Sequence, residues 1–126
     1  MGEVREILCY VSVAGNNKIA DWYEDLTVTE KADTDEFIKT MCKTQDWTGS
    51  SYKPSLRGYP KLGELRWDSG NKKHRLIGFF RDGKYVAVMG CYHKQQIYAP
   101  ADALEQAEKR RKQIVANEVK TVPYEL

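Results

Sequence analysis

Two apolar segments joined by Asp82-Gly83 place the tightest constraint on how this chain can fold. The first segment covers residues 74–80 and the second covers residues 85–92. Asp-Gly between two apolar runs is a preferred connection of an antiparallel hairpin, because both residues tolerate the positive φ angles that such a turn requires. The second segment is apolar at consecutive positions, which is typical of a strand buried on both faces. The sequence therefore predicts a β-hairpin whose second strand lies in the centre of a sheet.

Two further strands and a first helix are expected upstream of this hairpin. Residues 6–13 are rich in β-branched and apolar side chains, and residues 62–68 alternate between apolar and charged side chains, so both predict strands. Asn16 or Asn17 can cap a helix after the first strand. An apolar stripe at helical spacing marks that helix: Ile19, Trp22, Tyr23 and Leu26.

Two more helices complete the expected order of elements. One is expected over about 29–43, because its acidic first turn suits the positive end of a helix dipole. The other begins near Pro100, a residue that is favoured in the first turn, and Pro123 closes it. The predicted order is βααβββα in a single α+β domain over residues 1–126. We expect an antiparallel sheet with the helices packed on one of its faces.

Composition excludes several classes of protein. The chain has 126 residues, of which 41% are hydrophobic and 30% charged, so neither a disordered chain nor a disulfide-stapled miniprotein is expected. No apolar run approaches the about 18 residues of a membrane span. Cys9, Cys42 and Cys91 lie in apolar contexts without a CxxC partner. They are expected to be reduced core thiols of a cytoplasmic protein, and we expect neither a metal site nor a cofactor.

Charge is distributed unevenly along the chain. Residues 1–52 carry five Lys and Arg against ten Asp and Glu, whereas residues 53–94 carry ten against three. A basic segment beside an acidic one is the asymmetry expected of a protein that binds a polyanion. Solvated surface charges on strands and loops explain the same pattern equally well.

Three segments of the sequence carry a resemblance to a known family. The first is Leu56-Arg57-Gly58. The second consists of the predicted strand residues 62–66 together with residues 71–80, and the third is residues 90–100, which precede a predicted helix. In their joint spacing they resemble the RelE/ParE toxin superfamily, and within it the HigB-like, phage-derived toxins of type II toxin–antitoxin modules. The resemblance covers roughly residues 50–115.

This resemblance implies a fold, an activity and two kinds of partner. The fold would be an antiparallel sheet flanked by helices. The activity would be cleavage of mRNA without a metal ion, usually on message in the ribosomal A site. A helix-turn-helix antitoxin protein would neutralise the toxin.

Cleavage of RNA without a metal ion predicts which side chains carry the chemistry. The 2′-hydroxyl attacks the neighbouring phosphorus, so the protein must bind the phosphate, stabilise developing charge and move protons. Arg66 and Arg75 are the candidates for phosphate binding, and Arg75 interrupts an apolar strand, where a charge needs a partner or a cleft. His93 is the candidate general acid or base, and Lys94 beside it could stabilise the leaving group. Arg66 could equally be a surface residue paired with Glu64.

A second set of residues is expected to bind RNA outside the reacting centre. Lys53, Arg57 and Lys61 lie in or after the polar segment that leads into the sheet, and ordinary solvated charges are an equal alternative. Tyr92 and Tyr98 could stack on a base or share in proton transfer, although Tyr92 ends an apolar strand, which favours a place in the core. His74 should face away from Arg75 and is left out of the site.

Two other functions remain open from the sequence. The same scaffold could inhibit a target by docking and cleave nothing, as ParE-like toxins or a phage accessory protein would. Glu64 and Gln95 stand where the resemblance would favour basic residues, which weakens the catalytic hypothesis but leaves the fold unaffected. A small-molecule enzyme is disfavoured because the sequence lacks a phosphate-binding glycine loop and a nucleophile elbow.

Overall fold

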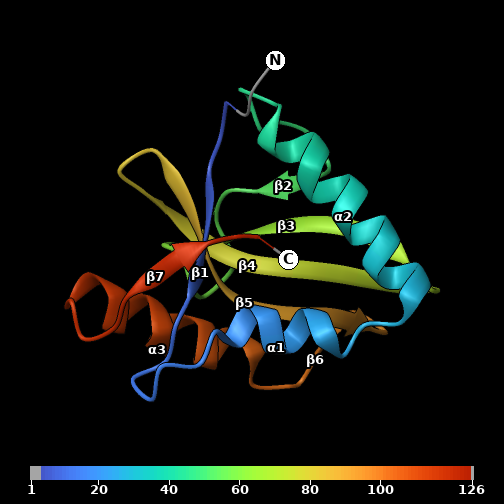
Figure 1. The fold of residues 1–126 in the computed structure, drawn as a ribbon. Coiled ribbons are helices and arrows are strands. Elements are labelled where there is room, and N and C mark those ends of the chain that lie inside the picture. The colour runs from blue at the N-terminus through green and yellow to red at the C-terminus, as the bar shows by residue number, and fades with distance from the viewer. Residues whose placement is uncertain (1–3, 126) are drawn as a thin grey trace.

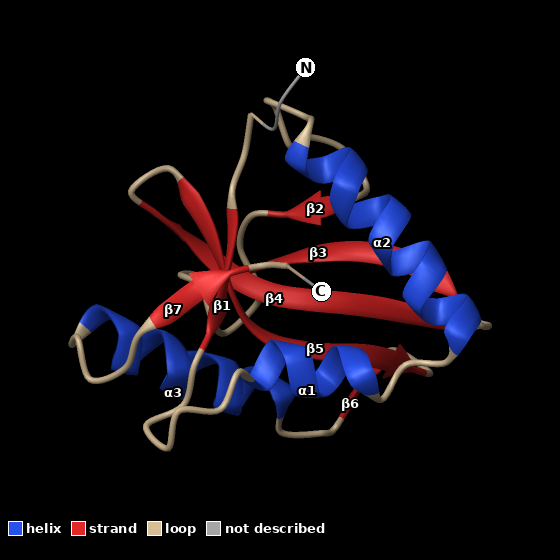
Figure 2. Ribbon diagram, in the orientation of Figure 1, coloured by secondary structure: helices blue, strands red, loops and turns tan. Residues whose placement is uncertain are grey.

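The structure is a computed structural model that describes residues 4–125. Within these residues it contains three helices and seven strands, which confirms an α+β fold (Figures 1 and 2). In chain order the elements are β1 (Ile7–Tyr10), α1 (Lys18–Glu24), α2 (Val28–Cys42), β2 (Tyr52–Lys53), β3 (Gly63–Ser69), β4 (Lys72–Arg81), β5 (Lys84–Lys94), β6 (Ile97–Ala99), α3 (Ala103–Val115) and β7 (Thr121–Pro123).

The sheet is organised around β5, as the sequence predicted. Its strands follow the order β2-β3-β4-β5-β1-β7, and β6 pairs with the last three residues of β5. All pairings are antiparallel except that of β1 with the first half of β5. The register between β4 and β5 shifts after Ile77, so Val88 is an extra residue in β5. A bulge of this kind bends the strand and increases its twist.

The helices cover both faces of the sheet, so the expectation that they share one face was wrong. Leu76 and Tyr85 pack in one core cluster with residues of α1 and α2, whereas the next residues along the same strands, Ile77 and Val86, pack with α3. Successive side chains of a strand point to opposite faces. Because β4 and β5 are apolar on both faces, each face needs its own helical cover.

Three hairpin turns of the same type connect β3 to β6. Asp82 and Gly83, at the end of the β4–β5 hairpin that projects from the sheet in Figure 1, have φ angles of 54° and 78°, which confirms the predicted turn. Gly70 and Asn71 have φ angles of 59° and 61° between β3 and β4. Gln95 and Gln96 adopt 52° and 66° between β5 and β6. A left-handed conformation costs about 1–2 kcal/mol per residue except for Gly and, in part, Asn and Asp.

The sequence analysis missed three short strands. The strands β2, β6 and β7 have only two or three residues each, which is too short for an alternating pattern to be visible. Pro123 does not close the last helix, as was expected, but lies in β7 opposite Leu8. This position is tolerated because β7 is an edge strand. Within the described residues, no helix combines the length and apolar character needed to cross a membrane.

Candidate functional site

The site is built around the buried carboxylate of Glu64 on β3. Its neighbour Leu65 belongs to the core under α1 and α2, so Glu64 lies on the opposite face of the sheet, the face that carries α3. Glu64 is 0% exposed to solvent. A buried carboxylate is costly unless charged or hydrogen-bonding groups surround it.

Three donors from three strands surround this carboxylate. Oε2 of Glu64 accepts a hydrogen bond of 2.8 Å from Nε of Arg66 and forms an ion pair with Nε of Arg75 at 3.3 Å. Oε1 accepts a hydrogen bond of 2.5 Å from the hydroxyl of Tyr98. We refer to Glu64, Arg66, Arg75, His93 and Tyr98 as the Glu64 cluster. It places two arginine side chains, predicted separately from the sequence, on one carboxylate.

Strand register explains why the two arginines meet. Arg66 lies directly opposite Arg75, and Arg75 lies opposite Cys91 on β5. Paired residues of adjacent antiparallel strands point to the same face. Two like charges in such positions repel each other, so the Glu64 carboxylate between them is what holds both guanidinium groups in place. The burial of Arg75 agrees with the prediction that a charge in this strand needs a partner.

Hydrogen bonding leaves part of each guanidinium group free. Both arginines direct Nε toward Glu64, and Arg75 also donates from Nη1 to the carbonyl oxygen of His74 at 2.8 Å. Within residues 4–125, both terminal nitrogens of Arg66 and Nη2 of Arg75 have no partner. The side chain of Arg66 is 32% exposed, so its fork is accessible from solvent.

His93 lies beside the arginines with an unpartnered nitrogen. It pairs with Tyr98 across the β5–β6 hairpin, and the two rings meet edge to face with centroids 4.3 Å apart. Its Nε2 is buried and has no hydrogen-bond partner in the described part of the chain. Burial lowers the pKa of His93 below its ordinary value of 6.5, and the charge of Arg75 lowers it further, against an opposing effect of Glu64. His93 is therefore mainly neutral at pH 7 and suited to accept a proton.

Tyr98 belongs to the cluster through its hydroxyl, and the stacking of its ring on a base stays a prediction. Burial raises the pKa of its hydroxyl, and the hydrogen bond to Glu64 raises it further. The hydroxyl therefore keeps its proton over the whole neutral range. Its position makes it a donor that fixes Glu64 rather than an acid that gives up its proton.

The four lysines and arginines predicted around the centre are all exposed. Lys53 lies on β2 opposite Glu64 and so borders the cluster. Lys94 ends β5 directly after His93, so its side chain starts on the other face of the sheet. Arg57 and Lys61 lie in the loop between β2 and β3, and the charge of Lys61 acts on Glu108 of α3.

Tyr92 lies apart from the cluster, on the face covered by α1 and α2. The Nζ atom of Lys72 lies 4.9 Å from the centroid of the Tyr92 ring, and the His74 ring is 6.5 Å away, centroid to centroid. Tyr92 and His93 are neighbours in one strand, so only one of them can face Arg75. The structure also confirms that His74 points away from Arg75.

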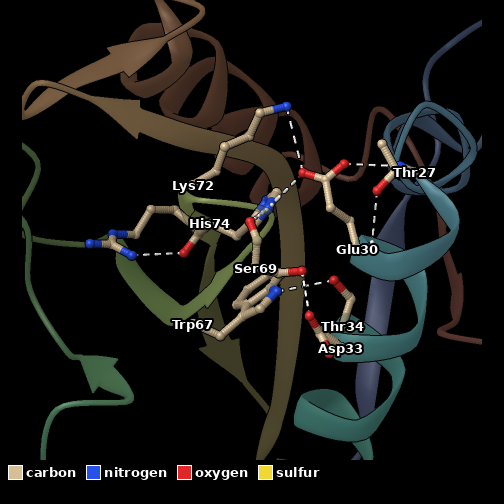
Figure 3. A network of polar contacts seen from close by, with 9 residues as sticks. Thr27, Glu30, Asp33, Thr34, Trp67, Ser69, Lys72 and His74 are labelled. Carbon is tan, nitrogen blue, oxygen red and sulfur yellow. Dashed lines mark hydrogen bonds and ion pairs between the residues drawn. The ribbon is translucent and has the colours of Figure 1, made fainter.

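A second buried glutamate organises this other face (Figure 3). Glu30 on α2 accepts a hydrogen bond of 2.9 Å from the backbone N–H of Thr27, whose hydroxyl in turn accepts one from the N–H of Glu30. This reciprocal capping box begins the helix. The other carboxylate oxygen lies 3.0 Å from Nε2 of His74 and 3.5 Å from Nζ of Lys72. We refer to these four residues as the Glu30 network.

Two further hydrogen bonds attach α2 to the sheet beside this network. Ser69 donates to Asp33 at 2.6 Å, and the indole N–H of Trp67 donates to Thr34 at 3.0 Å. Apart from the capping box and contacts within the sheet, the contacts drawn in Figure 3 run from α2 to Trp67 and Ser69 of β3 and to Lys72 and His74 of β4. The Glu30 network therefore belongs to the attachment of a helix.

Glu64 is the member of the site that the sequence analysis did not select. It was noted only as a possible surface partner of Arg66 and as a departure from the basic pattern. The structure confirms the pairing but places the Glu64 carboxylate in the interior, with Arg66 partly exposed above it. Two features of the sequence could have pointed to Glu64. Glu64 and Arg66 are two residues apart in a predicted strand, so their side chains face the same side, and Arg75 interrupts the next predicted strand with a charge.

Comparisons with known proteins identify the family of the chain. Neither the curated proteins nor the solved structures contain a match to it. Residues 24–112, more than half of the chain and including the whole Glu64 cluster, match the family described as phage derived protein Gp49-like (DUF891). The chain belongs to this Gp49-like family, which is related to the RelE/HigB-like toxins.

Proposed function

We propose that this protein is the toxin of a type II toxin–antitoxin pair and that it cleaves mRNA at the Glu64 cluster. The family match supports the toxin assignment. The convergence of Arg66, Arg75 and His93 supports the cleavage activity, because it joins two phosphate-binding groups to a neutral base. The HigB-like type, with a helix-turn-helix antitoxin as partner and translated message on the ribosome as substrate, belongs to the same proposal.

In the proposed reaction, the 2′-hydroxyl of RNA attacks the adjacent phosphorus. His93 takes the proton of this hydroxyl as the bond between O2′ and phosphorus forms. The bond between phosphorus and O5′ breaks, which leaves a 2′,3′-cyclic phosphate, and O5′ takes up a proton from water. Lys94 starts on the opposite face of β5 from His93 but is exposed at the end of the strand, and it adds positive charge that favours the departure of O5′.

The two arginines have unequal parts in this reaction. Arg66 offers two terminal nitrogens that have no partner in the described part of the chain, and they form the planar fork that binds two phosphate oxygens at once. Arg75 is more buried and keeps one terminal nitrogen, so it contributes charge at a fixed position. Both stabilise the negative charge that grows on the phosphorus oxygens in the transition state. Glu64 and Tyr98 are positioning residues that hold the arginines in place.

The proposal is tested by controlled expression without an antitoxin and genome-wide mapping of new mRNA 5′ ends. We expect new ends within translated frames, and we expect them to disappear in Arg75→Ala and in His93→Ala. Lys39→Ala, an exposed lysine on α2, is the matched control and should behave as the unchanged protein does. Thermal unfolding of each purified variant shows that loss of cleavage is not loss of fold.

The competing docking function gives a different result. Growth arrest without new 5′ ends would show that the protein inhibits a target by binding alone. Addition of a chelator to purified protein that cleaves RNA separates the proposed chemistry from a metal-dependent one, since the proposed reaction continues without divalent ions. Loss of cleavage in the chelator would contradict the roles given to Arg66, Arg75 and His93.

A further inference from the structure

The turn between β5 and β6 differs in its residues from the two other turns of its kind. All three turns have two central residues with positive φ, but Gly70-Asn71 and Asp82-Gly83 use residues that tolerate this conformation. The third turn uses Gln95 and Gln96, whose long side chains do not favour it. The chain therefore accepts backbone strain at one turn that it avoids at the other two.

The strained turn is attached directly to the Glu64 cluster. His93 pairs with Tyr98, and the next pair along the hairpin is Lys94 with Ile97, which is followed only by the two glutamines. Residues 94–97 are all exposed, and the side chain of Ile97 is 64% exposed. We refer to residues 94–97 as the β5–β6 tip. It stands beside the place where the proposed reaction occurs.

The glutamine side chains have no role within the described fold. Neither amide forms a hydrogen bond with residues 4–125, and neither side chain is buried. Asn-Gly would form the same turn with less strain. Contacts within the described fold therefore do not explain the choice of Gln95 and Gln96, whereas a contact with another molecule would.

We propose that Gln95 and Gln96 determine the sequence preference of cleavage by binding the base next to the scissile phosphate; this inference rests on the proposed function. An amide carries a donor beside an acceptor and matches the edge of an unstacked base that carries the same pair. Lys94 contributes attraction to the phosphate, and Ile97 contributes apolar surface for the base. The ligand is thus single-stranded RNA with one base turned out of its stack. A protein partner at the tip is the alternative that the test separates.

The double variant Gln95→Asn, Gln96→Gly tests this role without breaking the turn. It introduces the residues that the turn favours, so its melting temperature should equal or exceed that of the unchanged protein. In the expression experiment, cleavage should spread over a wider set of sequences. Preference at one nucleotide beside the cut should fall by about tenfold, the size expected when a bidentate base contact is lost. Asp82→Asn makes a comparable change in the turn between β4 and β5 and should leave the cut sites as they were.

The possible results separate the two proposals. If the unchanged protein cuts RNA and the double variant cuts the same sites with the same relative frequencies, the glutamines do not read the base and the inference is wrong, although the proposed function stands. This is also the result expected if a protein partner binds the tip. If the unchanged protein produces no new 5′ ends at all, the proposed function and this inference are overturned together.

Discussion

Glu30 and Glu64 are two glutamates buried against the same pair of strands, one on each face of the sheet. They are 3% and 0% exposed, and each is surrounded by hydrogen-bond donors and positive charge. By burial and by number of partners they look alike. They differ in the elements that supply those partners. This difference distinguishes a contact that holds the fold together from the proposed binding site.

The partners of Glu30 come from different layers of the molecule. Thr27 starts the helix on which Glu30 lies, whereas His74 and Lys72 belong to the sheet beneath it. These contacts fix α2 to β4. The partners of Glu64 all lie on strands that are already joined by backbone hydrogen bonds. Its ion pairs connect no separate layers, and among residues 4–125 they leave arginine nitrogens without partners. A buried ion pair is weak evidence for stability. The charge that the Glu64 cluster leaves available agrees with the phosphate binding proposed above.

The largest expected effect is the loss of cleavage in Arg75→Ala. Removal of one group that stabilises transition-state charge should lower the cleavage rate by about 10²–10³-fold. Arg75→Lys should remain impaired, because a lysine cannot contact Glu64, the His74 carbonyl and a phosphate with the same planar group. The rate is measured from the appearance of new 5′ ends after induction. Full activity in Arg75→Lys would show that charge alone is needed at this position.

On the other face, we expect the reverse pattern for Glu30→Ala. This change removes the capping box and leaves His74 without its charged partner, so the free energy of unfolding should fall by about 3 kcal/mol. The cleavage rate of the folded fraction should be unchanged. Urea unfolding measures the first quantity, with the exposed Glu36→Ala on the same helix as control. A large loss of cleavage in a folded Glu30→Ala protein would break the division between the two clusters.

Much of the fold could be predicted from the sequence because its signals are local. The Asp82-Gly83 turn was found from two residues and the apolar segments beside them. Asn17 caps α1 as one of two predicted candidates, and its side chain accepts hydrogen bonds from Ile19 and Ala20. The placement of α3 on the second face could not be found in this way, because an apolar stripe does not say which face of a sheet it covers.

The site was predictable only in part because it depends on strand register. Arg75 was found because a charge in an apolar strand requires a partner. The identity of that partner, Glu64, depends on which residues of β3 and β4 stand opposite each other, and no local pattern gives this. The same is true of Tyr98, whose hydroxyl reaches Glu64 from β6, a strand of three residues that the sequence did not reveal.

A smaller effect is expected from Thr27→Ala. This variant keeps the Glu30 carboxylate and its contact with His74 but removes the hydroxyl that accepts the N–H of Glu30. Loss of such a cap typically costs about 1 kcal/mol, so the change in unfolding free energy should be clearly less than in Glu30→Ala. Thermal unfolding of both variants compares them. Equal losses would show that the cap, and not the link to the sheet, dominates the Glu30 network.

The smallest expected effect is a shift in the pH dependence of the cleavage rate, and it should distinguish Glu64 from Glu30. If neutral His93 is the base, the cleavage rate should fall as the pH drops through its pKa, which lies below 6.5 because burial and the charge of Arg75 favour the neutral ring. Glu64 opposes this shift by stabilising the charged ring. In Glu64→Gln, the midpoint of the acid limb should therefore move to lower pH, whatever the change in maximal rate. In Glu30→Gln, the midpoint should stay in place, because Glu30 lies on the other face of the sheet. A midpoint that moves upward in Glu64→Gln, or equally in both variants, would contradict the assignment of His93 as the base.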